Sequence, residues 1–129
     1  MCIRDRAWFD EHPQDAGPAA AAELFCRCFA GQSPRANQRL ATLADRLLAD
    51  ADPGDPHTAF WVTHALFQAG GKVWAQWSKR VTTSIAAKQE TEGDRRGSWA
   101  PAGGASRLTT TLLNSLTLQA YYRYSRLVR

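Results

Sequence analysis

Two aspartates close together, Asp50 and Asp52, form the nearest approach to an acid–base pair in this sequence. They stand in Asp50-Ala51-Asp52-Pro53, and two adjacent carboxyl groups can hold one proton ready for transfer to a substrate. The segment is a connection rich in proline and aspartate, where Asp also forms turns and caps helices. Turn formation and capping account better for Asp50, Asp52 and Asp55, so we expect no catalytic acid here.

Histidine and cysteine are the next candidates, as metal ligands or nucleophiles. His57 and His64 are seven residues apart, which is about 10 Å along one helix face. Cys26 and Cys28 are two residues apart on a predicted helix, where their side chains point about 200° away from each other. Neither pair can share one metal ion, so we predict no metal site. We expect buried thiols that act as small hydrophobic residues.

Ser98 and the pair Gly103-Gly104 carry the last two signatures of chemistry. Ser98 stands in Gly97-Ser98-Trp99 without the flanking glycine of a nucleophile turn, and Gly103-Gly104 lacks the lysine of a phosphate-binding loop. We therefore predict no catalytic residue and no cofactor in this chain.

Charge and hydropathy exclude several classes of partner. The net charge of +4 comes from arginines scattered along the 129 residues, so it does not predict nucleic-acid binding. The longest apolar runs, such as 18–26, are too short to span a bilayer. Between Tyr121 and Arg129, aromatic residues alternate with arginines that could bind an acidic partner. A solvated helix end is the commoner reason for such a segment.

The first six residues, Met1-Cys2-Ile3-Arg4-Asp5-Arg6, resemble a peptide translated from a sequencing adapter. They show no helical or strand pattern, so we treat 1–6 as an artefact and 7–129 as the domain. On this interpretation the gene is truncated upstream. The absence of a signal peptide then says nothing about localisation.

The remaining sequence predicts about five helices and no strand, which places the domain in the all-α class. The predicted helices cover 18–30, 34/35–49, 55/56–70, 72–88 and 108–124. Asp55-Pro56 is an N-cap followed by a proline in the first turn, while Gly31 and Gly70-Gly71 are typical helix ends.

Hydrophobic patterning alternates along these helices. The first, third and fifth are apolar on most faces, whereas the second and fourth carry single stripes: Leu40, Leu43 and Leu47, then Trp74, Trp77, Val81 and Ile85. Inner helices contact neighbours on all sides, while outer helices face water on one side. We therefore predict two layers, with 18–30, 58–69 and 108–124 the more buried helices. An α-solenoid of helix pairs would alternate in the same way and stays open.

Several aromatic and glycine motifs between about residue 20 and residue 129 are shared with a known family. They are Phe60 to Gly71 with Trp74 and Trp77, Gln89 with Gly97-Ser98-Trp99, Leu116-Thr117-Leu118, and Tyr121 to Tyr124. This set is similar to the prenyltransferase/squalene-oxidase repeat proteins of planctomycete-type bacteria. The stretch from Gln89 to Trp99 looks like an expanded glutamine–tryptophan repeat motif of the terpene cyclases, in which the glutamine and the glycine usually lie closer together.

The resemblance implies a partial α/α-toroid with helices in alternating inner and outer layers. In such a motif the glutamine bonds backbone groups at a neighbouring helix end, and the tryptophan after the glycine turn covers that contact. Gln89, Gly97 and Trp99 are therefore expected to be structural, with Trp99 packed near Gln89. Trp61, Trp74 and Trp77 are expected in the core. The concave inner face is expected to include some of four residues: Phe60, His64, Thr110 and Leu113.

The related enzymes carry motifs that this sequence lacks. Squalene-hopene-type cyclases use Asp-x-Asp-Asp, whereas Pro53 follows Asp52 here. Protein prenyltransferase β subunits bind zinc through an Asp, an Asp-x-Cys pair and a His. The residues two before Cys26 and Cys28 are Leu24 and Cys26 itself, so neither cysteine fits that pattern.

The resemblance therefore implies a non-catalytic toroid fragment whose concave face binds a partner protein or an apolar ligand. The alternative is the remnant of a terpenoid cyclase or prenyltransferase-type enzyme whose catalytic motif lies upstream. An incomplete ring leaves apolar edges uncovered, so we expect the isolated fragment to self-associate.

Overall fold

The computed structural model describes the backbone of residues 3–123, which form six α-helices and a 3-10 turn. The helices are α1 (Ile3–Glu11), α2 (Gly17–Phe29), α3 (Gln38–Asp50), α4 (Pro56–Ala69), α5 (Gly71–Ala86) and α6 (Arg107–Arg123), with η1 (Gly93–Arg95) between the last two. Residues 3–123 contain no β-strand, only two isolated bridges, so the all-α prediction is confirmed. Within the same range, every helix is too short or too polar to cross a membrane.

The first helix, α1, is absent from the sequence-based prediction. Residues 3–6 form its first turn, so the expectation that this segment has no helical structure is wrong for these four residues. Apolar periodicity is weak in α1, and a polar contact fixes it to the body. The Asp10 carboxylate accepts a hydrogen bond from the Arg27 guanidinium of α2 at 2.9 Å. Hydrophobic patterning cannot reveal a helix that is held in this way.

Local capping explains where the other helices begin and end. Asp55 Oδ2 accepts a hydrogen bond from Thr58 N at 3.0 Å, so the predicted N-cap of α4 is confirmed. Gly31 has a φ of +81° and ends α2, as predicted. The helix predicted from 34/35 starts instead at Gln38, because the side chain of Asn37 accepts hydrogen bonds from the first free backbone N–H groups of α3.

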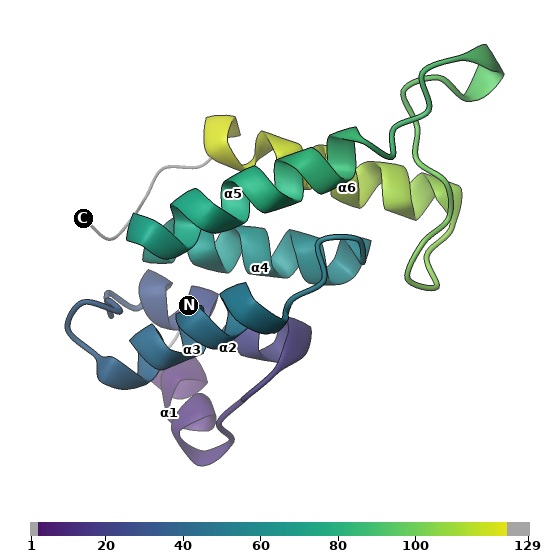
Figure 1. The fold of residues 1–129 in the computed structure, drawn as a ribbon. Coiled ribbons are helices and arrows are strands. Elements are labelled where there is room, and N and C mark those ends of the chain that lie inside the picture. The colour runs from purple at the N-terminus through teal and green to yellow at the C-terminus, as the bar shows by residue number, and fades with distance from the viewer. Residues whose placement is uncertain (1–2, 124–129) are drawn as a thin grey trace.

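Helix α4 lies at the centre of the body and packs against α2, α3, α5 and α6 (Figure 1). The contacts follow two series. In one, α4 packs between α2 and α6; in the other, α3 packs against α5. The connection from α5 to α6 projects from one end of this body, with η1 at its tip (Figure 1).

Burial follows the predicted layers in part. Nine residues of α4 and six of α2 are buried, against four each in α3 and α5, as expected. For α6 the prediction is wrong. Its described buried residues are Thr110, Asn114, Thr117 and Ala120, while Leu108 is 80% exposed and Leu112 is 56% exposed. Among the helices of residues 3–123, α6 packs closely only against α4, which leaves Leu108 and Leu112 without a covering helix there.

Two tryptophans of α5 belong to the core. Trp77 is fully buried, and its indole N–H donates to Thr63 Oγ1 at 2.8 Å. Trp74 is buried against Phe67, with the two ring centroids 5.1 Å apart. The core prediction is thus confirmed for Trp74 and Trp77. It is wrong for Trp61, whose ring is 38% exposed.

Candidate functional site

Five rings of α2 and α4 contact one another in a continuous series, which we call the aromatic row. The row consists of Phe29, Phe25, His64, Phe60 and Trp61. Successive ring centroids along it are 4.6, 6.4, 4.4 and 5.5 Å apart. Its two end members are open to solvent, since Phe29 is 48% exposed and Trp61 is 38% exposed. The row is therefore an apolar surface supported by two packed helices, which is what a binding site for an apolar group requires.

His64, in the middle of the row, is buried and has 6% of its surface exposed. Its Nδ1 lies 2.8 Å from the Phe60 carbonyl oxygen, one turn earlier in α4. Burial lowers the pKa of His64 below its ordinary value, and the bond to the Phe60 carbonyl acts in the opposite, weaker direction. The imidazole is thus neutral at neutral pH, which keeps charge out of the aromatic row.

The four residues expected on a concave face are brought together only in part. Phe60 and His64 are in ring contact within the aromatic row. Thr110 is wrong as a face-lining residue, because it is 1% exposed and its hydroxyl accepts a hydrogen bond from Ala102 N at 3.3 Å. Leu113 of α6 is half-buried. The other row members, Phe25 and Phe29, show an aromatic i, i+4 spacing on α2 that could have revealed them in the sequence.

Gln89 and Trp99 close the base of the projecting connection. They form an antiparallel bridge, so the predicted proximity of Trp99 to Gln89 is confirmed. The predicted roles of the Gln89 and Trp99 side chains are wrong. The exposed Gln89 side chain donates to the Gly97 carbonyl of its own loop at 3.1 Å. The indole N–H of Trp99 instead donates to the Ile85 carbonyl at the end of α5, at 2.7 Å.

The geometry explains this reversal. Carbonyls in the last turn of a helix have no partner within the helix, and Trp99, which is 4% exposed, reaches one of them from the core side. Gly97 has a φ of +85°, a left-handed conformation that favours glycine and turns the chain back toward Gln89. Trp99 therefore anchors the connection to the end of α5, whereas the Gln89 side chain bonds only within the connection.

We expect Trp99→Phe to lower the free energy of unfolding more than Gln89→Ala does. Phenylalanine keeps most of the apolar contact but loses the indole hydrogen bond, so the Ile85 carbonyl keeps only its bond from Lys88 N at 3.1 Å, at a cost of about 0.5 to 1.5 kcal/mol. Gln89 is exposed, so water replaces its bond, and the cost should be about 0.5 kcal/mol or less. Urea unfolding followed by far-ultraviolet circular dichroism measures both. Equal losses would show that the tryptophan bond is not the anchor.

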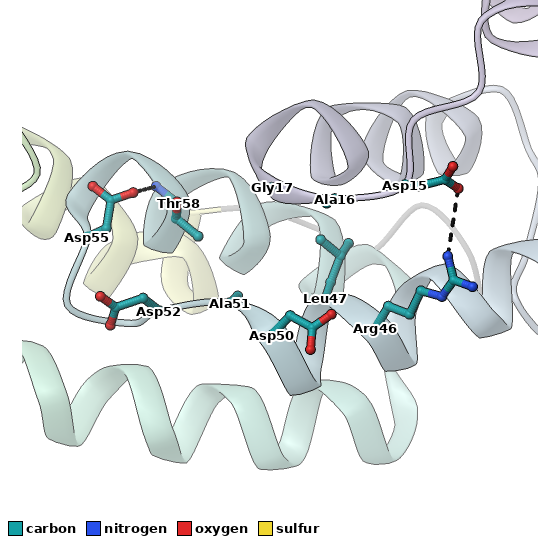
Figure 2. Close-up of a pocket in the computed structure, with 10 residues that line it drawn as sticks. All are labelled: Asp15, Ala16, Gly17, Arg46, Leu47, Asp50, Ala51, Asp52, Asp55 and Thr58. Carbon is teal, nitrogen blue, oxygen red and sulfur yellow. Dashed lines mark hydrogen bonds and ion pairs between the residues drawn. The ribbon is translucent and has the colours of Figure 1, made fainter.

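A cavity, which we call the acidic cavity, lies where the end of α3 meets the starts of α2 and α4 (Figure 2). It has a volume of about 250 Å³ and is lined by Asp15, Ala16, Gly17, Arg46, Leu47, Asp50, Ala51, Asp52, Asp55 and Thr58. Both aspartates of the candidate acid–base pair, Asp50 and Asp52, are among these residues. The cavity therefore brings Asp15, Asp50, Asp52 and Asp55 together in one place.

Hydrogen bonds and an ion pair engage three of the carboxylates that line this cavity. Asp52 Oδ1 accepts a hydrogen bond from Gly54 N at 2.7 Å, which forms the turn before α4. Asp55 caps α4, and Asp15 forms a 3.8 Å ion pair with Arg46 (Figure 2). Turn and cap roles are thus confirmed for Asp52 and Asp55. The cavity needs no ligand to explain its composition.

Metal and thiol chemistry find no further support. Within the described part of the chain, no three His, Cys, Asp or Glu side chains are placed to bind a metal ion. Cys28 is buried, and burial raises the pKa of its thiol to about 11. The thiol therefore stays protonated and is a poor nucleophile at neutral pH. Cys26 is half-buried.

Comparisons with known proteins add no relative to this description. The arrangement of helices and the aromatic row therefore have to be interpreted from the chain's own residues. The sequence matches no protein-family model and no curated protein, and the structure matches no solved structure.

Proposed function

We propose that this chain is a non-catalytic helical scaffold of the α/α-toroid type, which binds a partner protein or an apolar ligand on the aromatic row. The observation that carries the proposal is the row of five rings in contact, which is exposed at its two ends, Phe29 and Trp61. Large aromatic side chains that stay exposed although they are packed side by side are typical of interaction surfaces. The two series of helix contacts are compatible with alternating inner and outer layers.

The aromatic row offers a contact surface with few polar groups. Its rings supply flat apolar surface, and His64, whose pKa is lowered by burial, adds no charge at neutral pH. The nearest candidates for acid chemistry, Asp52 and Asp55, lie in the acidic cavity and hold a turn and a helix end. These features favour binding over catalysis.

An uncharged fluorescent probe, N-phenyl-1-naphthylamine, tests the row as an apolar site. We expect the probe to bind the wild-type protein, and the double variant Phe29→Ser/Trp61→Ser to weaken binding about tenfold, which corresponds to about 1.4 kcal/mol. The double variant Trp8→Ser/Leu108→Ser is the matched control, because it removes two exposed apolar side chains elsewhere. An equal loss in the control would contradict a defined site.

Light scattering on the same proteins tests self-association. The apparent mass of the wild type should rise with concentration, because an exposed apolar row also favours contact between copies. The Phe29→Ser/Trp61→Ser variant should stay closer to the monomer mass of 14.3 kDa. A wild type that remains monomeric at every concentration would contradict the incomplete-ring interpretation.

A further inference from the structure

A groove opens between α5 and α6, with Thr63 of α4 at its floor. Its volume is about 470 Å³, and its lining residues are Thr63, Trp74, Ser78, Lys79, Val81, Thr82, Thr83, Thr117, Leu118 and Tyr122. Thr63, Val81 and Thr117 are buried at its floor, whereas Thr82 and Lys79 are exposed at its rim. It shares no residue with the aromatic row, so the two surfaces can be tested separately.

The packing of α3 indicates what shape of occupant fits this groove. Helix α3 packs against α2, α4 and α5. It covers one flank of α5, where the Arg80 guanidinium donates to the Leu48 carbonyl at the end of α3 at 2.6 Å. Ser78 and Thr82 lie two residues before and after Arg80, so they point about 200° away from it.

The groove is therefore the opposite flank of α5. Within residues 3–123, α5 packs against α3 and α4 but not closely against α6, which leaves this flank open. A helix laid there would contact α5 and α6 much as α3 contacts α5 and α4. Its groove-facing side would need an apolar stripe to cover the half-buried Leu118 and the exposed Tyr122, like the stripe of Leu40, Leu43 and Leu47 on α3.

Charge indicates the chemistry of the occupant. The two helices that flank the groove contain five basic residues and no acidic residue: Lys72, Lys79, Arg80, Arg107 and Arg123. Two of them are already engaged, because Arg80 binds the end of α3 and Arg107 pairs with Glu90 at 3.3 Å. Lys79 stays at the groove rim and is exposed. An occupant with acidic residues beside its apolar stripe would complement this rim.

We propose that the groove between α5 and α6 binds an amphipathic helix of a partner protein, with an apolar stripe against Leu118 and Tyr122 and acidic residues beside Lys79. Helix-in-groove binding gives the apolar contacts most of the affinity, and the charges set the choice of partner. A basic helix with the same stripe would place like charges against the rim.

Fluorescein-labelled synthetic peptides based on α3 test this proposal by fluorescence anisotropy with the full chain. The acidic peptide has the sequence of residues 37–51 with Arg39→Glu and Arg46→Glu. The basic peptide keeps both arginines and has Asp45→Lys and Asp50→Lys, and both retain the leucine stripe. We expect the acidic peptide to bind at least about tenfold more tightly than the basic one.

Variants of the chain locate the site. Thr82→Trp fills the groove from an exposed position and should abolish binding of the acidic peptide, while Lys79→Glu should weaken it about tenfold. Thr42→Trp and Arg35→Glu make the same kinds of change at exposed positions outside the groove and should leave binding unchanged. Circular dichroism confirms that each variant is folded.

Four results would overturn the proposal. The first is that neither peptide binds, or that both bind equally. In the second, the groove variants bind like the wild type. The third is unchanged binding of an acidic peptide whose leucines are replaced by serine, which would show a general polyanion surface. Loss of the wild type's self-association in Thr82→Trp is the fourth, since the occupant would then be a second copy of this chain.

Discussion

Replacing Trp77 by alanine is expected to lower the free energy of unfolding by about 3 to 5 kcal/mol. Trp77 has 0% of its surface exposed, and its indole N–H donates to Thr63 Oγ1 at 2.8 Å. The Arg80 guanidinium lies 5.4 Å from the ring centroid. Alanine would open a cavity in the core, leave the Thr63 hydroxyl without this donor and remove the surface on which Arg80 rests. Such a loss is a large part of the about 5 to 15 kcal/mol that stabilises a typical domain.

Urea unfolding followed by circular dichroism measures this loss. Trp77→Phe keeps much of the apolar volume but loses the indole donor, so its unfolding free energy should lie between those of the wild type and Trp77→Ala. Trp61→Ala is the matched control, because Trp61 is 38% exposed and belongs to the aromatic row. A control loss as large as that of Trp77→Ala would contradict the assignment of the two tryptophans to core and surface.

Glu23→Ala is expected to destabilise the fold by a similar amount, about 3 to 5 kcal/mol, because it breaks a buried ion pair from one side. Glu23 is a carboxylate with 0% of its surface exposed. It accepts hydrogen bonds from Arg27 Nε at 2.8 Å, from Arg39 Nη2 at 3.0 Å and from the Gln14 backbone at 2.7 Å. These contacts tie α2 to α3 and to the segment that follows α1.

The cost arises on the arginine that would remain. Arg27 is 5% exposed. Burial by itself would lower the pKa of Arg27, but the hydrogen bonds and negative charges of Glu23 and Asp10 outweigh burial and raise it. Without Glu23, a buried guanidinium would keep only its 2.9 Å bond to Asp10 and a 3.5 Å contact with Gln32.

Thermal unfolding of Glu23→Ala, Glu23→Gln and Asp15→Ala separates buried from exposed pairing. Asp15→Ala removes the 3.8 Å pair with Arg46, whose side chains are 72% and 56% exposed. Exposed pairs contribute about 0 to 1 kcal/mol, so this control should unfold almost like the wild type. Glu23→Gln keeps the shape and should fall in between. A Glu23→Ala protein as stable as the control would show that the cluster adds nothing to the fold.

Local patterns in the sequence predicted the five main helices because their signals are short-range. The Asp55-Pro56 start of α4 and the Gly31 end of α2 depend on residues within one turn, and the structure places both as expected. Trp74 and Trp77 repeat at helical spacing, so their burial could be inferred from the same stretch. Glu23 was overlooked in an apolar run, although its i, i+4 spacing to Arg27 is visible in the sequence.

The candidate sites depended on contacts that no local pattern contains. Phe25 and Phe60 belong to one aromatic row because α2 packs against α4. Thr110 does not lie on the expected face, because its hydroxyl accepts a hydrogen bond from the loop before α6. Within residues 3–123, the groove is open because α5 packs against α3 and α4 and not closely against α6.

The sequence by itself determined the helical class, the start of α4, the end of α2 and the burial of Trp74 and Trp77, since each follows from residues within about four positions of one another. Only the tertiary structure decided that Leu108 and Leu112 face solvent while Thr110 and Asn114 are buried. Hydrophobic residues are buried only where a neighbouring element covers them. Among the described helices, α6 packs closely against α4 alone, and its buried residues are Thr110, Asn114, Thr117 and Ala120.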